Sequence, residues 1–397
     1  MRVKLFLFLL VLNTSFLISQ IGIQSYQSII TGAQQTDLYL PRLKNKKVAI
    51  VTNASGIIGN KHLVDTLLKH KIKIVKIFGP EHGFRGTADA GEKVKSGKDA
   101  LTNITVVSLY GSHKKPTKED LKGIDIVIYD IQDVGVRFYT YISTMTYVME
   151  ACAENNKELI IFDRPNPNGF YIDGPVMTDK YKSFLGLHNV PIVYAMTCGE
   201  YAAMVNGEGW LKDKMKCKLT IIPLKNYDRS KFVSGLPIKP SPNLPNDSAV
   251  LLYPSLGLFE GTIVSLGRGT DFPFQVIGNP YADQGSFPFT FTPKSTAISK
   301  RPKYQDTLCY GMDMRIQFDY ILKHKQIDLT LLNMFYHHSL DKQNSFFDNN
   351  FNFHAGNEEL KQQTILSISP MEIRESWKSD LYKFKKTRKK YLIYEDF

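Results

Sequence analysis

The chain has 397 residues, of which 43% are hydrophobic and 22% are charged. This length suits two packed domains, and this composition excludes a disordered or a collagen-like protein. Lys and Arg outnumber Asp and Glu by 50 to 38, a formal net charge of +12. Such a basic surface could attract nucleic acid, anionic lipid or an acidic polymer, or could simply be solvated. No zinc-finger or basic-zipper pattern favours nucleic acid.

The four cysteines contain no CxxC pair, which excludes a zinc knuckle and a thioredoxin-type motif. Four cysteines in a chain of this size do not form a disulfide scaffold. We expect most of them to be buried as small hydrophobic side chains.

Residues 1–20 have the pattern of a secretory signal peptide. Arg2 and Lys4 precede the apolar run 5–12, and no cysteine follows that run to carry a lipid anchor. The run is shorter than the roughly 20 apolar residues that a membrane-spanning helix needs. We therefore expect an exported protein without a stable membrane anchor, located in the periplasm or outside the cell.

From residue 47 onward, short apolar strands alternate with helical segments. The expected strands are 48–51, 72–78, 106–109, 124–129, 159–162 and 219–224. The expected helices are 62–70, 140–154 and 198–211, the last with Thr197 as its N-cap. This alternation predicts an α/β fold with a Rossmann-like, doubly wound, mostly parallel sheet.

The alternation stops at residues 237–245, where four prolines in nine residues exclude regular structure. We expect the Rossmann-like N-terminal domain to span 21–247. The remaining residues, 248–397, are less periodic and predict a smaller α+β domain that closes the active-site cleft.

In an open α/β sheet, ligands bind outside the carboxyl ends of the strands, so polar loops at those ends are candidate sites. The loop 79–86 follows a strand and combines Glu81, His82 and Arg85 with three glycines. A glutamate held in such a loop could act as a general acid or base. The alternative is a charged surface turn.

A second polar loop, residues 130–141, follows the strand 124–129. Asp130, Gln132 and Asp133 could bind sugar hydroxyls or a hard metal ion, and Arg137 could hold a carboxylate. Alternatively, Asp133 could only cap the next helix and Asp130 could only bond to the backbone.

Two further loops complete the candidate set. The stiff loop 163–169 carries Asp163 and Arg164, which could contact a ligand or pair with one another. In the second domain, Glu260 and Arg268 could complete a cleft between the domains.

Several familiar motifs are incomplete or absent. Residues 56–59 follow the first strand, but the full G-x-G-x-x-G of a dinucleotide site is missing. No G-x-S-x-G elbow occurs. His82, His113 and His188 are possible metal ligands, but they have no HExxH-type spacing. We expect neither a bound metal nor a cofactor.

Taken together, six segments resemble the signatures of the NamZ-type exo-β-N-acetylmuramidases, from about residue 47 to the C-terminus. These segments are GPEHGFRG (79–86), DIQDVGVRFYTY (130–141), DRPNPNG (163–169), GLHNVPIVYAMTCGEYA (186–202), PSPNLP (240–245) and LFEGTIVSLGRGTDFPF (258–274). The resemblance implies a Rossmann-like domain, a smaller C-terminal domain and an active-site cleft between them. It also implies release of N-acetylmuramic acid from the non-reducing ends of peptidoglycan fragments, without a nucleotide cofactor.

The resemblance places the glutamate that the family proposes as catalytic on Glu81. The catalytic set expected from it and from the loops is Glu81, Asp130 and Asp133. The expected substrate-binding residues are His82, Arg85, Gln132, Arg137, Tyr139, Asp163, Arg164, Asn243, Glu260 and Arg268.

Glycoside cleavage needs an acid at the leaving oxygen and a second group at the anomeric carbon. We expect Glu81 to be the acid, with His82 or Tyr139 bonded to it. Asp130 or Asp133 could be the second group, or the sugar's own acetamido group could attack. A cation must bind the lactyl carboxylate, and the candidates are Arg85, Arg137, Arg164 and Arg268.

Two other functions fit the same residues. The fold could be a secreted module that binds peptidoglycan fragments without cutting them. It could also be a metal-dependent hydrolase centred on Asp130, Asp133 and His82. Nucleic acid is not an expected partner in any of these cases.

Overall fold

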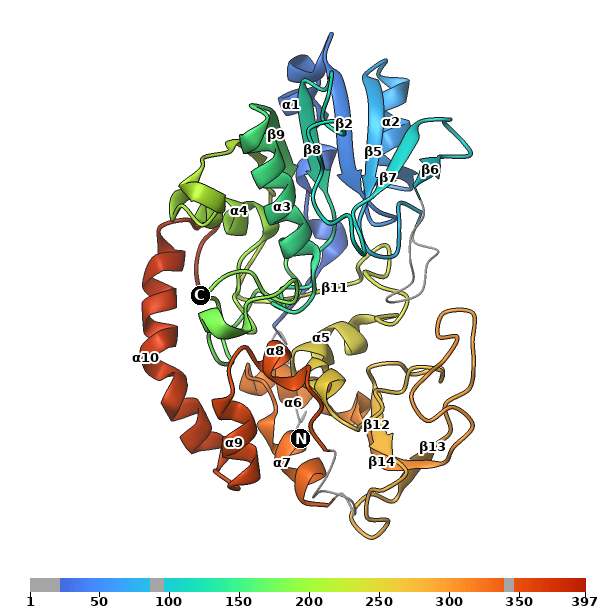
Figure 1. Ribbon diagram of the computed structural model, residues 1–397, viewed down its shortest axis with the longest axis vertical. Helices are drawn as coiled ribbons and strands as arrows, with labels where there is room; N and C mark the ends of the chain where they lie inside the picture. Colours follow the sequence, from blue (N-terminus) through green and yellow to red (C-terminus); the bar gives the residue numbers. More distant parts are fainter. Residues whose placement is uncertain (1–21, 86–95, 339–345) are drawn as a thin grey trace, which may run out of the picture.

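The computed structural model describes residues 22–85, 96–338 and 346–397. The expected signal peptide lies outside these residues, as does Gly86 at the end of the first motif. An N-terminal part built around a seven-stranded sheet lies above a smaller part with helices and an antiparallel sheet (Figure 1). The expected two-part α/β fold is confirmed.

The strands of the main sheet lie in the order β10-β9-β8-β2-β5-β7-β6. All neighbours pair in parallel except β6 with β7 at one edge. Counted along the chain, the parallel strands have the spatial order 3-2-1-4-5-6 that characterises the Rossmann fold. The strand bounds are β2 (Lys47–Thr52), β5 (Lys73–Gly79), β6 (Gly97–Lys98), β7 (Thr105–Ser108), β8 (Ile126–Asp130), β9 (Glu158–Phe162) and β10 (Lys218–Ile222). All six expected strands are thus present.

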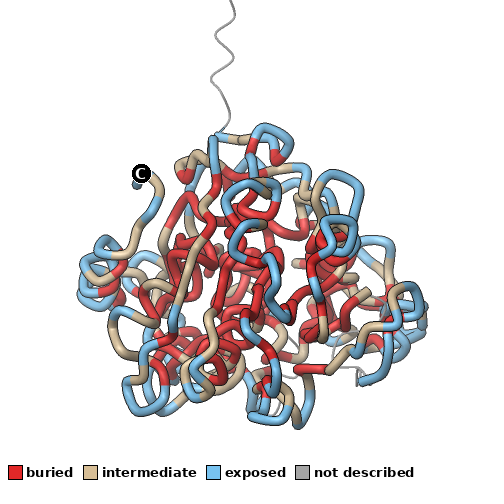
Figure 2. The backbone as a smooth tube through the Cα atoms, turned by 90° about the horizontal axis from the view of Figure 1, so that it is seen from above, coloured by how far each residue is buried: buried red, intermediate tan, exposed pale blue. Residues whose placement is uncertain are grey.

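Helices cover both faces of this sheet. Successive residues of each buried strand point to opposite faces, so each strand contributes side chains to both cores. Val48 and Ile50 of β2 pack with α1 (Thr36–Leu43) and α2 (Leu63–Lys69). Ala49 and Val51 belong to the other core, with α3 (Tyr141–Glu154) and α4 (Cys198–Gly207). Buried residues fill the centre and exposed residues form the periphery (Figure 2).

The expected helices are confirmed with one change of length. Thr197 caps α4 through a capping box in which its side chain accepts from the backbone N–H of Glu200. The helix ends at Gly207 instead of residue 211. Gly209 then adopts a φ of +69°, a conformation that ends helices readily at glycine.

The proline-rich residues 237–245 form turns, and the helix α5 (Asp247–Leu256) follows them directly. The exact division of the chain at residue 247 stays a prediction. Beyond it, β12 (Val276–Asn279), β14 (Cys309–Asp313) and β13 (Phe289–Phe291) form an antiparallel sheet. The helices of this part are α6 (Phe318–His324), α7 (Leu329–His337), α8 (Phe351–Ala355) and α9 (Glu359–Ile365).

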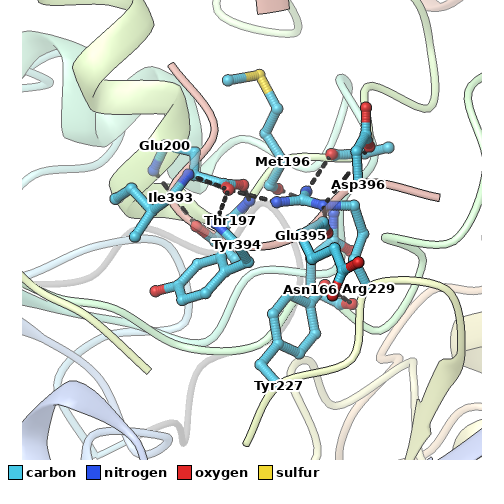
Figure 3. A network of polar contacts seen from close by, with 12 residues as sticks. Asn166, Met196, Thr197, Glu200, Tyr227, Arg229, Ile393, Tyr394, Glu395 and Asp396 are labelled. Carbon is cyan, nitrogen blue, oxygen red and sulfur yellow. Dashed lines mark hydrogen bonds and ion pairs between the residues drawn. The ribbon is translucent and has the colours of Figure 1, made fainter. Parts of the chain in front are cut away.

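The end of the chain returns to the N-terminal part. Helix α10 (Pro370–Lys389) runs up the side of the molecule, and the last residues lie beside α4 (Figure 1). There, Glu200 pairs with Arg229, and its Oε1 accepts hydrogen bonds from the backbone N–H groups of Ile393 and Tyr394 (Figure 3). The short strands β1 (Ile23–Ser25) and β11 (Phe232–Ser234) pair nearby. Both ends of the described chain therefore stabilise the N-terminal part.

All four cysteines, Cys152, Cys198, Cys217 and Cys309, are buried and free, as expected. None of the helices in the described part of the chain is both long enough and apolar enough to cross a membrane.

Candidate active site

A cavity of about 300 Å³ lies where the carboxyl ends of β5, β7 and β8 face the C-terminal part. Both parts of the chain contribute to its wall, so the cleft is completed only when they pack together. The lining residues are Glu81, His82, Tyr110, Phe138, Tyr139, Thr140, Tyr141, Phe184, Leu185, Ser241, Asn243, Leu244, Tyr253, Glu260, Arg268 and Phe274.

Glu81 lies in a sharp turn directly after β5. His82 and Gly83 both have positive φ values, 67° and 75°, and the Gly83 N–H donates to the Pro80 carbonyl at 2.9 Å. A positive φ is uncommon for residues other than glycine, and the two successive positive values make the chain turn sharply at this point. The turn fixes the glutamate at the end of the strand, where the open-sheet rule places a ligand.

Two hydroxyl groups hydrogen-bond to the Glu81 carboxylate. Thr140 Oγ1 donates to Glu81 Oε2 at 3.4 Å, and the hydroxyl of Tyr110 also hydrogen-bonds to this carboxylate. Burial raises the pKa of Tyr110, and the negative charge of Glu81 raises it further. The phenol therefore stays protonated and serves as a donor to the carboxylate.

Aromatic rings form the wall beside Glu81. The ring centroids of Tyr139 and Tyr141 lie 4.8 Å apart at 75°, and Tyr253 packs edge-on against Tyr139. The Tyr139 hydroxyl donates to the Pro240 carbonyl at 2.6 Å, and the Tyr141 hydroxyl accepts from Asn53 at 2.9 Å. These bonds hold the rings in place, and flat aromatic faces suit the apolar face of a sugar ring.

A second carboxylate, Glu260, faces the same cavity from the C-terminal part. Its Oε1 accepts from Arg268 Nη2 at 2.5 Å, and His354 Nε2 lies 3.8 Å from its Oε2. Burial raises the pKa of Glu260, but the charges of Arg268 and His354 outweigh burial and lower this pKa to about 2. Glu260 is therefore ionised across the physiological pH range.

The proline-rich loop supplies the third side of the cavity. Ser241 Oγ lies 3.4 Å from His82 Nε2, which connects this loop to the Glu81 turn. Asn243 is 2% exposed, and neither its Nδ2 nor its Oδ1 has a hydrogen-bond partner in the described structure. Unsatisfied buried polar atoms are rare and call for an explanation.

The structure brings together six of the residues expected from sequence: Glu81, His82, Tyr139, Asn243, Glu260 and Arg268. The other seven do not line the cavity, and each has partners that explain its position.

Asp130 and Arg164 form a buried ion pair instead of facing the cavity. Arg164 Nε donates to Asp130 Oδ1 at 2.6 Å, and its other groups bond to the Tyr26 hydroxyl and the Ile57 carbonyl. This pair occupies the point between β2 and β8 where a Rossmann fold would bind a dinucleotide.

Asp133, Gln132 and Asp163 also bond within the protein. Asp133 Oδ2 accepts from the Tyr194 hydroxyl at 2.5 Å and from Gly135 N–H at 2.7 Å. Gln132 donates to backbone carbonyls, and Asp163 accepts from Thr197, Gly199 and Tyr394. Burial raises the pKa of Asp133 and of Asp163 to about 6.

The two remaining arginines have structural partners. The fully buried Arg137 donates to the carbonyls of Pro175, Val190, His354 and Ala355, which ties the two parts of the chain together. Arg85 forms a two-bond ion pair with Asp99, at 3.0 and 2.9 Å. Neither guanidinium contacts the cavity.

Sequence reasoning missed Tyr110, Ser241, Tyr253 and Phe274 as cavity residues. Tyr110 lies two residues beyond the end of β7, so the rule that ligands bind at the carboxyl ends of strands also points to it. Ser241 and Phe274 lie within segments that the motif resemblance covered. No local signal marks Tyr253, because it reaches the cavity from the buried helix α5.

The described residues do not form a cluster of side chains that could bind a metal ion. Among residues 22–85, 96–338 and 346–397, no group of three or more His, Cys, Asp or Glu side chains could hold a metal. The proposed metal ligands Asp130 and Asp133 are bonded to Arg164 and Tyr194, as described above. This arrangement gives the metal-dependent alternative no support.

Comparison with known proteins agrees with the motifs. The model for the N-terminal domain of the exo-β-N-acetylmuramidase NamZ matches residues 48–248, and the C-terminal model matches 251–394. The peptidoglycan β-N-acetylmuramidase NamZ of Bacillus subtilis (strain 168) is 39% identical over 90% of this chain and 89% of its own.

Two crystal structures of DUF1343 family proteins from Bacteroides fragilis NCTC 9343 have the same fold. One is 45% identical with a TM-score of 0.86, and the other is 28% identical with a TM-score of 0.76. Each covers 93% of this chain, and this chain covers 99% of each of them. The chain belongs to the NamZ family of exo-β-N-acetylmuramidases.

Proposed function

We propose that this protein is an exo-acting glycoside hydrolase that releases N-acetylmuramic acid from the non-reducing ends of peptidoglycan fragments. Family membership and the B. subtilis relative named as a peptidoglycan β-N-acetylmuramidase support the reaction class. The observation that carries the proposal is the cavity that Glu81 and Glu260 both line.

The size of the cavity supports the exo mode. A volume of about 300 Å³ is at the small end for ligand sites, and suits one terminal sugar better than a continuous glycan strand. The aromatic side chains of Tyr139, Tyr141 and Phe184 offer flat surfaces to such a sugar.

Glu81 is the general acid of this proposal. The turn after β5 fixes its backbone, and the hydroxyls of Tyr110 and Thr140 orient its carboxyl group. In glycoside hydrolysis, the protonated form of this group transfers its proton to the oxygen of the leaving sugar as the glycosidic bond breaks, and a water molecule adds at the anomeric carbon. Proton transfer from a positioned acid contributes about 10²- to 10⁴-fold to the rate.

Glu260 supplies the negative charge that the transition state needs. Its low pKa keeps it ionised, and it lines the same cavity as Glu81 but comes from the other part of the chain. We assign to it the stabilisation of the positive charge that develops at the anomeric carbon. Asp130 and Asp133, the residues expected for this role, are bonded to Arg164 and Tyr194 outside the cavity.

Arg268 is our assignment for the partner of the lactyl carboxylate. It is the only one of the four candidate arginines that lines the described cavity. One Nη group bonds to Glu260, which leaves other N–H groups of the guanidinium for a second carboxylate. A fixed, planar guanidinium favours carboxylate recognition over a neutral hydroxyl.

Export from the cytoplasm is part of the proposal. Its support is the sequence pattern of residues 1–20, which lie outside the described structure. The net charge of +12 suits an anionic glycan.

The direct test is to incubate the protein with defined peptidoglycan fragments and to identify the products by mass spectrometry. Free N-acetylmuramic acid, with a shortened fragment beginning with N-acetylglucosamine, is the expected result. Fragments that bind but stay intact would instead indicate a non-catalytic binding module.

A further inference from the structure

Asn243 has an unusual position among the residues of the cavity. Its side chain is almost completely buried, yet its Nδ2 and Oδ1 have no hydrogen-bond partner in the described structure. Leaving both a donor and an acceptor unsatisfied costs stability, whereas water or a ligand would normally satisfy them. A residue in this state at a cavity wall is a strong candidate for binding a ligand.

The loop around Asn243 is held in place without the help of that side chain. The Pro240 carbonyl accepts from Tyr139, the Leu244 N–H donates to the Ser241 carbonyl at 3.0 Å, and the Asn243 N–H donates to Ser241 Oγ at 3.3 Å. Pro242 and Pro245 stiffen the same segment. These contacts fix the backbone of the loop at the cavity wall, and both hydrogen-bonding atoms of the Asn243 amide remain for a ligand.

We propose that Asn243 recognises two adjacent positions of the bound muramic acid ring through hydrogen bonds. Its Oδ1 accepts from the N–H of the 2-acetamido group, and its Nδ2 donates to the ether oxygen at C3. This assignment rests on the proposed function, and it adds the residue that recognises the branched side of the sugar.

The chemistry of the sugar matches the amide. In N-acetylmuramic acid the group at C2 is a donor, while the oxygen at C3 carries the lactyl group and can only accept. A carboxamide presents one acceptor and one donor side by side, which complements this pair. N-acetylglucosamine differs at C3, where its hydroxyl can also donate.

This difference gives Asn243→Asp a specific expected effect. A carboxylate has two acceptors and no donor, so it accepts from the acetamido N–H but repels the ether oxygen. The free 3-hydroxyl of N-acetylglucosamine can instead donate to that carboxylate. The substitution should therefore shift the preference from muramide towards glucosaminide.

The experiment measures kcat/KM for a chromogenic β-N-acetylmuramide and for the matching glucosaminide. We expect Asn243→Asp to lower the muramide-to-glucosaminide ratio at least about tenfold, the factor for roughly one hydrogen bond. Asn243→Ala should lower both rates and leave the ratio within about threefold. Asn333→Ala, at a residue that does not line the cavity, is the control for an asparagine substitution as such.

Charge repulsion between an aspartate and the lactyl carboxylate must be separated from the effect on the ether. A muramide whose lactyl group is an amide carries no charge there, and the shift should persist with it. A shift that disappears with the lactamide, or an unchanged ratio in Asn243→Asp, would overturn the assignment of Asn243. Failure of the proposed function differs from both, because the wild type would then release nothing from either muramide.

Folding provides a further check. Because Asn243→Ala removes two unsatisfied polar atoms, we expect its Tm to equal or exceed that of the wild type while its activity falls. A large drop in Tm would instead indicate a structural role and would contradict the proposal.

Discussion

Arg268 donates from Nη2 to Oε1 of Glu260 at 2.5 Å, and both side chains line the cavity that also contains Glu81. The guanidinium also lies over the Phe274 ring, 5.0 Å from its centroid. One cation thus holds Glu260 in its ionised form and remains available to a substrate carboxylate. This double role leads to a prediction that separates binding from catalysis.

Arg268→Ala should raise KM for muramides by about 10- to 100-fold, because a charge-assisted contact to the lactyl group is lost. It should change KM for the matching glucosaminide little. Loss of the positive charge should also raise the pKa of Glu260, so that Glu260 becomes protonated at a higher pH than in the wild type. The acid limb of the pH–rate profile should therefore shift to higher pH. A pH–rate profile on both substrates measures the two effects; equal changes in KM for the two sugars would contradict the assignment.

Tyr110→Phe removes one hydroxyl that bonds to Glu81 and keeps the aromatic ring. We expect kcat to fall about threefold to tenfold, as for one hydrogen bond that positions a catalytic group. KM should change little. Steady-state kinetics are the measurement, and Tyr382→Phe on the exposed face of α10 is the matched control. Equal kinetics for Tyr110→Phe and the control would remove Tyr110 from the site.

Arg164→Ala should lower the stability of the folded protein and should have no direct effect on the catalytic step. The substitution leaves the fully buried Asp130 charge without its partner, a change that typically costs about 3–5 kcal/mol. Thermal unfolding should show a large drop in Tm. Lys122→Ala, which breaks an exposed ion pair with Glu119, should leave Tm nearly unchanged. An Arg164→Ala protein of wild-type stability would show that the pair is not structural.

Asp133 makes stability depend on pH. Burial raises its pKa to about 6 in the folded protein, so the folded state holds this proton more tightly than the unfolded state. The resulting stabilisation is complete below the unfolded pKa of roughly 4, and it is lost as the pH rises through about 6. A shift of about two units corresponds to about 3 kcal/mol.

Asp133→Asn should remove this dependence. The free energy of unfolding of the wild type, minus that of the variant, should therefore decrease between pH 4 and pH 7. Urea denaturation at several pH values measures this difference. A difference that is constant with pH, or that increases, would contradict the raised pKa.

The sequence predicted the sheet well because its strands are short, continuous apolar runs. β2 and β8 are buried along almost their whole length, and such runs are typical of parallel strands covered on both faces. Helix α1 was not predicted, because it is short and contains Pro41. The hairpin of β3 (Ile57–Ile58) and β4 (Lys61–His62) is too short to give a periodic signal.

The site was predicted in part, for a physical reason. The rule that ligands bind at carboxyl ends of strands points to the end of the sheet where the cavity lies, but it does not give the direction of each side chain. β5 ends at Gly79, and Glu81, two residues further on, reaches the cavity. Asp130 is the last residue of β8 and bonds to Arg164 instead. Tyr253 and Phe274 reach the cavity through long-range packing, which sequence spacing does not encode.

The most direct test compares the wild type with Glu81→Gln on a chromogenic β-N-acetylmuramide and the matching β-N-acetylglucosaminide. We predict that the wild type releases the chromophore from the muramide and that Glu81→Gln loses about 10²- to 10⁴-fold of this activity. Glu119→Gln, a glutamate on the exposed surface, should keep wild-type activity. Wild-type rates in a folded Glu81→Gln protein would contradict the central role of Glu81.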